Sequence, residues 1–395
     1  MKRETMSGDS SLLKAINKST LLQLTKLHAP ISRAELAKQT KLTRATVSAL
    51  VEELIAEHWI TETGIGQSSG GRKPMMLEMN NTAGYVIGVD MRATNMLCVV
   101  TDLGGRVVRK SQYPYEAASD AELVFQQLGS LIGKERELLP GSPLGLIGAG
   151  IGIHGYVEYP SSRILFVPHI GWKQLQWKER LEEQLGIPVI IDNEANLAAL
   201  GEFEYGAAAD CPDMLYLSVA AGIGAGLILH GELFRGNGGF AGEVGHTTLE
   251  LNGRACSCGN KGCWETYASE RAIANDLHRE YSPDFTEWLL AQLKAQKPDA
   301  LAAVRTAGQY LGVGIGNMMQ TLNPQMIVIG SAAGRYADWI DESVHQSLSE
   351  RFSYMSSFRV EVKYSRLGED GCALGAISSV IRDRMSLQPG SSNLS

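Results

Sequence analysis

Apolar residues recur at helical spacing in three successive segments near the start of the chain. Pro30 separates the first segment from the second, which opens with Ser32 and carries Glu35 three residues later, the spacing of a capping box. Thr43 opens the third and longest segment after a short turn. Three helices with a tight turn between the last two predict a helix-turn-helix. The expected helices span residues 12–28, 32–40 and 43–58.

Two short extended segments follow the third helix, at residues 59–63 and 75–79. The eleven residues between them are rich in glycine and serine and end in Arg72-Lys73-Pro74, so they are suited to a loop. Together the two segments and the loop predict a β-hairpin. Residues 1–80 are therefore expected to form a winged helix-turn-helix.

Beyond Ala83 the pattern changes to short, strongly apolar runs that are typical of buried strands. Three strands are followed by a helix-rich stretch and a fourth strand, and the same order returns later in the chain. This repetition predicts an α/β fold of two similar halves that face each other across a cleft, where small ligands usually bind. The expected strands are residues 85–91, 97–102, 107–113 and 146–153 in the first half, and 214–220, 224–229, 232–234 and 326–330 in the second.

The patterns divide the chain into four expected parts. Residues 1–80 form the head, residues 81–200 the first half and residues 201–370 the second half. A helix over residues 371–385 is expected to pack back onto the first half. The polar tail, residues 386–395, is expected to be disordered.

Composition places the chain among ordinary globular proteins, with 44% hydrophobic and 20% charged residues. No run approaches the roughly 18 apolar residues of a membrane span, and the N-terminus lacks the apolar core of a signal peptide, so we expect a cytoplasmic protein. Residues 1–80 hold 11 Lys/Arg and 8 Asp/Glu, whereas the remainder brings the net charge of the whole chain to −7. A mildly basic head on an acidic body favours nucleic-acid contact through the head alone.

One histidine and three cysteines gather within 18 residues, as His246, Cys256, Cys258 and Cys263. An imidazole and three thiolates are a tetrahedral zinc set, and four protein ligands make a closed, structural site. The glycines at 259 and 262 permit the tight turns of such a loop. The alternative is a group of buried thiols beside an unrelated histidine. We expect one structural Zn²⁺ per chain.

Segments 242–246 and 256–265 resemble the signature of the ROK family, which comprises repressors, open reading frames and sugar kinases. The resemblance covers nearly the whole chain, and the winged head is similar to that of the repressor branch, because the kinases lack it. The family implies an actin-like, ribonuclease H-like fold, a homodimer or homotetramer, and a sugar effector. Within it the chain most resembles the xylose repressors of Gram-positive bacteria, through segments 32–36, 66–74 and 191–196.

Three departures from the kinase pattern bear on catalysis. Residues 90–94 read Asp-Met-Arg-Ala-Thr, where ROK kinases carry the Asp-x-Gly-Gly-Thr turn that approaches the ATP phosphates. Residues 220–224 read Ala-Ala-Gly-Ile-Gly, in place of Gly-Thr-Gly-Ile-Gly. Glu194 stands where the kinases have their aspartate base, and a base that is misplaced by one methylene loses efficiency. We therefore expect that the protein is not an enzyme; the alternative is a sugar kinase with an appended head.

The same resemblance implies that Asn193 and Glu194 bind the sugar from the first half, and that Glu243, His246 and Glu265 bind it from the second. Carboxylates accept hydrogen bonds from sugar hydroxyls, while amide and imidazole groups can also donate. For Glu243 and Glu265 the alternative role is only to support the metal loop. The longer Glu194 is suited to a pentose, because it can reach the space that a hexose fills with its hydroxymethyl group.

Segments 152–155 and 166–172 are a further family feature near the expected pocket. His154 and His169 replace the proline and asparagine that are more frequent in kinases, so the pocket is altered. Trp172 can stack on the apolar face of a sugar or serve as a core residue, and the sequence does not distinguish these roles.

The DNA-binding residues are expected in two places on the head. The first turns of the second helix of a helix-turn-helix read the major groove, which selects Thr43, Arg44, Thr46 and Ser48, with Arg44 suited to guanine. Arg72 and Lys73 form a basic wing tip that fits a narrow, A·T-rich minor groove. The alternative is a solvated helix face.

These features predict a sugar-responsive repressor of xylose-utilisation genes. A sugar, expected to be D-xylose, binds in the cleft and releases an inverted-repeat operator. Two other interpretations are a ROK sugar kinase with an added head and a DNA-binding scaffold that senses nothing.

Overall fold

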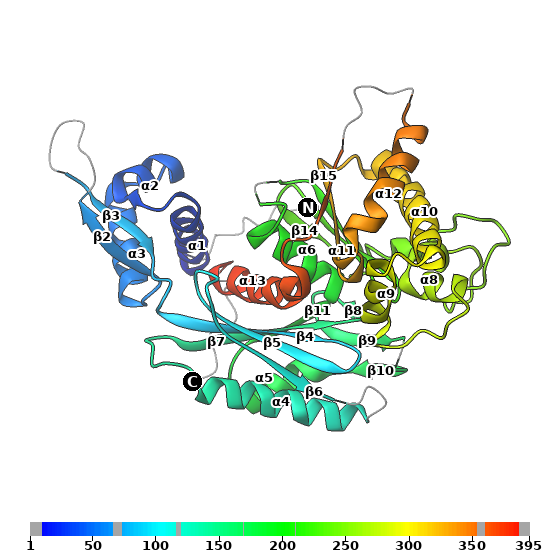
Figure 1. The fold of residues 1–395 in the computed structure, drawn as a ribbon. Helices are drawn as coiled ribbons and strands as arrows, with labels where there is room; N and C mark the ends of the chain where they lie inside the picture. Colours follow the sequence, from blue (N-terminus) through cyan, green and yellow to red (C-terminus); the bar gives the residue numbers. More distant parts are fainter. Residues whose placement is uncertain are drawn as a thin grey trace, which may run out of the picture.

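The computed structural model describes residues 10–65, 73–115, 120–168, 170–209, 211–353 and 360–386. Most of the expected wing loop, including Arg72, lies outside these ranges, as do His169 and the expected tail from residue 387. The described chain forms a helical head with a small sheet, followed by two sheets with helices on their faces (Figure 1). None of the helices in these ranges combines the length and apolar character of a membrane-spanning segment.

The head has the predicted winged helix-turn-helix order. The Ser32 hydroxyl accepts a hydrogen bond of 3.2 Å from the Glu35 backbone N–H, which starts the second helix, and Thr43 caps the third helix through the Thr46 N–H at 3.1 Å. Lys41 takes a left-handed φ of 59° and makes the turn between them. The elements are α1 (Ser10–His28), β1 (Ile31–Ser32), α2 (Arg33–Thr40), α3 (Arg44–Ala56), β2 (Ile60–Ile65) and β3 (Met75–Met79).

Helix α3 ends two residues before its predicted end. His58 takes a left-handed φ of 65°. The Trp59 N–H then bonds back to the Leu54 carbonyl at 2.9 Å and the His58 N–H to the Ile55 carbonyl at 3.0 Å, which is the Schellman arrangement. The helix was expected to end at about His58, and the closure at this residue uses a histidine where glycine is usual.

The first body sheet has the strand order β11-β7-β4-β5-β6. Strands β4, β7 and β11 run parallel, while β5 and β6 are antiparallel additions. In Figure 1, α13 lies over one face of this sheet, and α4 and α5 lie on the other. The elements are β4 (Gly84–Met91), β5 (Asn95–Asp102), β6 (Val107–Pro114), α4 (Ala121–Glu137), β7 (Gly145–Ile153), α5 (Trp177–Leu185), β11 (Val189–Asn193) and α13 (Gly371–Ser386).

The second body sheet repeats this order as β16-β15-β12-β13-β14, with the same parallel and antiparallel pairs. Two similar halves were predicted, and the repeated topology confirms them. Helices α10 and α12 pack on each other beside this sheet (Figure 1). The elements are β12 (Met214–Val219), β13 (Ile223–Leu229), β14 (Glu232–Phe234), β15 (Met326–Gly330), β16 (Glu361–Tyr364), α7 (Glu265–Ala268), α8 (Glu270–Asp276), α9 (Phe285–Lys294), α10 (Pro298–Leu322), α11 (Ala332–Arg335) and α12 (Ala337–Arg351).

Helix α6 (Glu194–Tyr205) lies between the two halves. It packs closely against α13 and also contacts β12 and β13 of the second sheet. The expected boundary at residue 200 therefore falls inside this helix. A small third sheet, β8 (Tyr156–Glu158), β9 (Arg163–Val167) and β10 (Trp172–Leu175), extends from the end of β7.

The head is packed onto the body through a continuous apolar core. Leu21 and Leu22 of α1 are fully buried in one cluster with Ile377 and Ile381 of α13. The Ser19 hydroxyl donates a buried hydrogen bond of 2.8 Å to the Met385 carbonyl. Head and body therefore share a hydrophobic core.

Candidate functional site

The parallel strands of the first sheet end side by side and place polar residues at one edge. In the strand register, Ile153 at the end of β7 stands between Met91 of β4 and Asn193 of β11. His154 is the next residue after β7 and Glu194 the next after β11. The carboxyl ends of parallel strands are where α/β sheets bind ligands.

Four charged or titratable side chains meet at this edge. His154 Nε2 lies 3.4 Å from Asp90 Oδ1, and His154 Nδ1 lies 3.6 Å from Glu194 Oε1. Arg92 holds the other oxygen of Asp90 at 2.8 Å and reaches Glu369 at 2.9 Å. Burial opposes ionisation of Asp90, but His154 and Arg92 outweigh it and lower the pKa of this carboxyl below its usual value.

Asn193 is largely occupied by the backbone. Its side-chain oxygen caps α6 by accepting from the Ala195 N–H at 2.8 Å and the Asn196 N–H at 3.2 Å, and its amide nitrogen donates to the Gly155 carbonyl at 3.1 Å. One N–H remains for a ligand. The cap fixes Glu194 in the first turn of the helix, pointed at the strand ends.

Acidic residues from the second half face this edge. Burial and the negative charge of Glu194 raise the pKa of Glu243. The Tyr156 hydroxyl, from β8, is the hydrogen-bond partner of Glu243, and burial with this carboxylate raises the pKa of Tyr156 to about 12. A carbon added at Gly224 would lie 3.8 Å from Glu194 Oε1, and one at Gly222 would lie 2.9 Å from Glu265 Oε2. The turn before β13 and the first residues of that strand therefore adjoin a carboxylate of each half.

The predicted metal ligands come together. The donor atoms of His246, Cys256, Cys258 and Cys263 all lie within 4.8 Å of one another. The Sγ atoms of Cys258 and Cys263 are 3.7 Å apart, and Cys256 Sγ is 3.6 Å from His246 Nδ1. With metal–sulfur bonds of about 2.3 Å and metal–nitrogen bonds of about 2.0 Å, a tetrahedral ion requires S···S and S···N separations of about 3.8 and about 3.5 Å. The four residues can hold a tetrahedral metal ion.

Glu265 lies beside these ligands at the start of α7. Its Oε1 atom is 3.0 Å from Cys256 Sγ and 3.6 Å from His246 Nδ1, while its Oε2 atom is directed at Gly222. One oxygen thus supports the metal loop and the other faces the turn before β13. Because His246 turns Nδ1 to the cysteines, its Nε2 is left for a ligand.

Some residues near the site differ from the expectation or were not anticipated. Trp172 packs on Trp177 at 5.4 Å between ring centroids and adjoins the buried core, which favours its core role. Tyr156 was missed because only the tertiary fold brings β8 to Glu243. The basic residue Arg33 was also missed, although its place one residue after the cap Ser32 was a usable signal.

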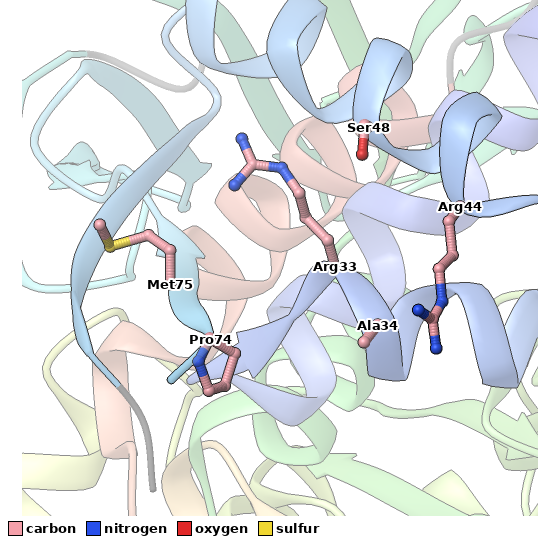
Figure 2. A pocket seen from close by; sticks show the side chains of 6 residues that line it. All are labelled: Arg33, Ala34, Arg44, Ser48, Pro74 and Met75. Atoms are coloured by element: carbon pink, nitrogen blue, oxygen red, sulfur yellow. The ribbon is translucent and has the colours of Figure 1, made fainter. Parts of the chain in front are cut away.

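The face of the head that carries the start of α3 is hollowed. Figure 2 shows side chains from α2, α3 and the start of β3 around a hollow of about 240 Å³. Arg44 and Ser48, two of the predicted DNA contacts, line it with Arg33, whose guanidinium pairs with Glu62 at 2.7 Å. Thr43 and Thr46 bond to each other at 2.8 Å, and Lys73 is exposed beside Pro74. Arg44 and Ser48 thus line the same hollow as Pro74 and Met75 at the start of the second wing strand.

These features define a winged helix-turn-helix protein with a two-half body of the sugar-kinase type. Residues 86–383 match the ROK family, and residues 15–61 match a winged helix-turn-helix DNA-binding family. The chain belongs to the ROK family.

Three relatives refine this placement. The xylose repressor of Bacillus subtilis is 36% identical over 374 residues, which cover 95% of this chain and 97% of the relative. A crystallised ROK family transcriptional regulator, a homologue of the Escherichia coli MLC protein, superposes with a TM-score of 0.81 at 26% identity, covering 95% of this chain and 98% of its own. A ROK family glucokinase from Streptomyces griseus, solved with glucose and AMPPNP, has a TM-score of 0.65 at 26% identity and covers 75% of this chain and 99% of its own.

Proposed function

We propose that this protein is a sugar-responsive, DNA-binding transcriptional repressor of xylose-utilisation genes. The observation that carries the proposal is that a winged helix-turn-helix head and a ROK body occur in one chain. This chain is similar to a xylose repressor over almost the full length of both proteins. D-xylose is the proposed effector, and binding of the sugar weakens binding of the operator.

The proposed sugar site lies where the two halves face each other. Its ligands are Asn193, Glu194, Glu243, His246 and Glu265, as the family resemblance implies. The approach of Glu265 to Gly222 and of Glu194 to Gly224, with Glu243 in the electrostatic field of Glu194, supports this assignment. Glu194 is the proposed discriminator for a pentose, and a Glu194→Asp variant with unchanged affinity and sugar preference would count against that role.

Zn²⁺ is the proposed structural metal of His246, Cys256, Cys258 and Cys263, because three thiolates and one imidazole are a donor set that suits this ion and their donor atoms lie within 4.8 Å of one another. Four protein ligands leave no open position for chemistry. The ion would fix the loop that carries His246 and Glu265, and so link loop geometry to the ligand.

The proposed operator is an A·T-rich inverted repeat that is bound by a homodimer or homotetramer. Arg44 and Ser48 would contact base edges, while Thr43 and Thr46 would contact phosphates or bases beside them. Lys73, and Arg72 outside the described residues, would enter the minor groove. Arg44→Ala should weaken operator binding by about 1–3 kcal/mol.

The protein is proposed to have no kinase activity. In the turn after β4, the Arg92 side chain bridges Asp90 and Glu369, in the segment where a kinase keeps glycines. Glu194 is held by His154 at 3.6 Å. Both arrangements favour ligand binding without phosphoryl transfer.

The deciding experiment titrates zinc-replete protein calorimetrically with xylose, glucose and N-acetylglucosamine, and then measures operator binding with and without each sugar. Selective xylose binding that releases DNA without ATP hydrolysis is the expected result. A roughly 100-fold release requires about 2.7 kcal/mol of differential sugar binding between the two states. ATP turnover on any aldose would instead favour the kinase interpretation.

A further inference from the structure

The strand order places a histidine between two acids. Strand β7 is central, with β4 on one side and β11 on the other. Asp90 pairs with Gly152 in the register, and Asn193, the residue before Glu194, pairs with Ile153. His154 therefore lies between Asp90 of β4 and Glu194, the residue that follows β11, and its ring contacts both carboxylates.

The two acids use the histidine differently. Asp90 is buried, and its Oδ1 atom accepts no hydrogen bond from the described residues, so the imidazole 3.4 Å away is the group placed to compensate it. Glu194 has His154 as its basic partner, through Oε1. This contact leaves Oε2 of Glu194 to accept from a ligand hydroxyl.

The remaining charges around the ring come from three elements. Arg92 follows β4 and already pairs with Asp90 and Glu369. Cys372 of α13 lies against Gly152 and beside Asp90, and burial with these negative charges holds its pKa far above the usual value, so it stays a neutral thiol. Glu243 approaches Glu194 from the second half. A positive charge on His154 is thus opposed by one arginine and favoured by the carboxylates around it.

We propose that His154 is a positioning residue of the sugar site, whose protonated ring bridges Asp90 and Glu194 and fixes the Glu194 carboxylate to accept a hydroxyl of a neutral aldose. The identity of the ligand in this inference rests on the proposed function, whereas the bridge of His154 between Asp90 and Glu194 is independent of that function. The His154 side chain is 43% exposed, so the ring is open to protons and lies at the surface that a ligand would meet.

The electrostatics agree with the geometry. Partial burial of the ring lowers its pKa, but Glu194 and Asp90 outweigh this effect and raise the pKa of His154 from 6.5 to about 9. A group whose pKa is raised in the folded state keeps its favourable contribution at lower pH and loses it as the pH rises through the folded value. Sugar affinity should therefore hold at neutral pH and fall as the pH passes about 9.

The first test is NMR of the histidine side chains in the full-length, zinc-replete protein between pH 6 and 10. The expected result is an imidazole that titrates near pH 9 and is absent from His154→Gln. In Asp90→Asn and Glu194→Gln its midpoint should move down. A His154 ring that titrates at or below its ordinary value of about 6.5 would overturn the bridge.

The second test is calorimetric titration with D-xylose at pH 7.5 and at pH 10. The wild type should lose about tenfold in affinity across this interval, whereas His154→Gln should be about tenfold weaker at pH 7.5 and show no further loss. His154→Lys, which keeps a positive charge, should recover affinity at pH 7.5. The control His345→Gln removes an exposed histidine that pairs with Asp341 of its own helix and should behave as the wild type.

Metal content and operator binding without sugar report whether each variant is folded. His154→Gln with wild-type affinity and a wild-type pH profile would overturn the positioning role. If the wild type binds none of xylose, glucose and N-acetylglucosamine, the proposed function fails, while the NMR titration still decides on the bridge.

Discussion

The two halves of the body share one strand order but differ in chemistry at equivalent positions. Asp90 of β4 pairs with Gly152 of β7, and Ser218 of β12 pairs with Gly330 of β15 in the same way. The first half thus has a buried carboxylate where the second has a buried hydroxyl. The Asp90 carboxylate can therefore pair with His154 and Arg92, whereas the Ser218 hydroxyl carries no charge for such ion pairs.

The second half places its candidate residues in a different kind of segment. Glu243, His246 and Glu265 all lie between β14 and α8, in the segment that carries the four candidate metal ligands. The first half therefore positions its residues by strand register and helix capping, whereas the second would position them through the proposed metal site. A duplicated fold fixes where a site can lie, whereas the local residues decide what it does.

Metal removal should have the largest effect on sugar affinity, and it should change the second half of the body while leaving the first half unchanged. Chelation or Cys263→Ser should lower sugar affinity by roughly 100-fold or more, because two proposed ligands belong to the metal loop. Calorimetry measures the loss, and Cys211→Ser is a control outside the cluster. Hydrogen exchange in β4 and β7 should stay unchanged; lost protection there would mean that the halves are not independent.

Asp90→Asn tests the first half by removing the charge that His154 and Arg92 share. We expect the free energy of unfolding to fall by about 2–3 kcal/mol, because hydrogen bonds to a charged group contribute more than neutral ones. Ser218→Ala, at the equivalent position, should cost about 1 kcal/mol or less. Chemical denaturation of the full chain compares them, and equal losses would contradict the contrast between the two edges.

Glu265→Gln asks whether this carboxylate binds sugar or only supports the metal loop. If it binds, sugar affinity should fall roughly 10–100-fold, the equivalent of about 1.4–2.7 kcal/mol, while metal content stays at one ion per chain. Glu250→Gln is the control, since Glu250 bonds Tyr310 at 2.7 Å elsewhere in the loop segment. Loss of metal from the Glu265 variant would point to the supporting role.

Lys26→Met should have the smallest effect on stability, because exposed ion pairs contribute about 0–1 kcal/mol. Lys26 of the head lies 3.1 Å from Glu204 near the end of α6, which also pairs with Arg382 of α13 at 2.8 Å. We expect unchanged sugar affinity but a several-fold smaller release of operator by sugar. Lys14→Met, which breaks a pair with Glu53 inside the head, should leave release unaltered.

Much of the fold followed from sequence patterns, because helical spacing, capping residues and short apolar runs act over a few neighbours. The ends of elements were less predictable. The Schellman closure at His58 has no glycine from which it could be predicted. Helix α6 crosses the expected boundary at residue 200 and contacts elements of both halves, which only the tertiary structure shows.

The residues of the candidate site also differ in how far the sequence predicts them. The metal ligands could be predicted, because four donors lie within 18 residues and their types specify the chemistry. The contact of His154 with Asp90 and Glu194 could not, since it depends on the alignment of three strands that are distant in sequence. The contact of Tyr156 with Glu243 could not be predicted either, because it forms only where the two halves face each other and no local sequence pattern encodes that arrangement.

Helix α6 begins with Glu194, a proposed sugar ligand, and carries Glu204 near its other end, where this carboxylate pairs with Lys26 of the head. This arrangement limits how the protein can be re-engineered as a biosensor. A foreign DNA-binding head joined by a flexible tether would lose both the Lys26 contact and the shared apolar core. A working chimaera should keep α1 with the body and exchange only the groove-reading helix and the wing.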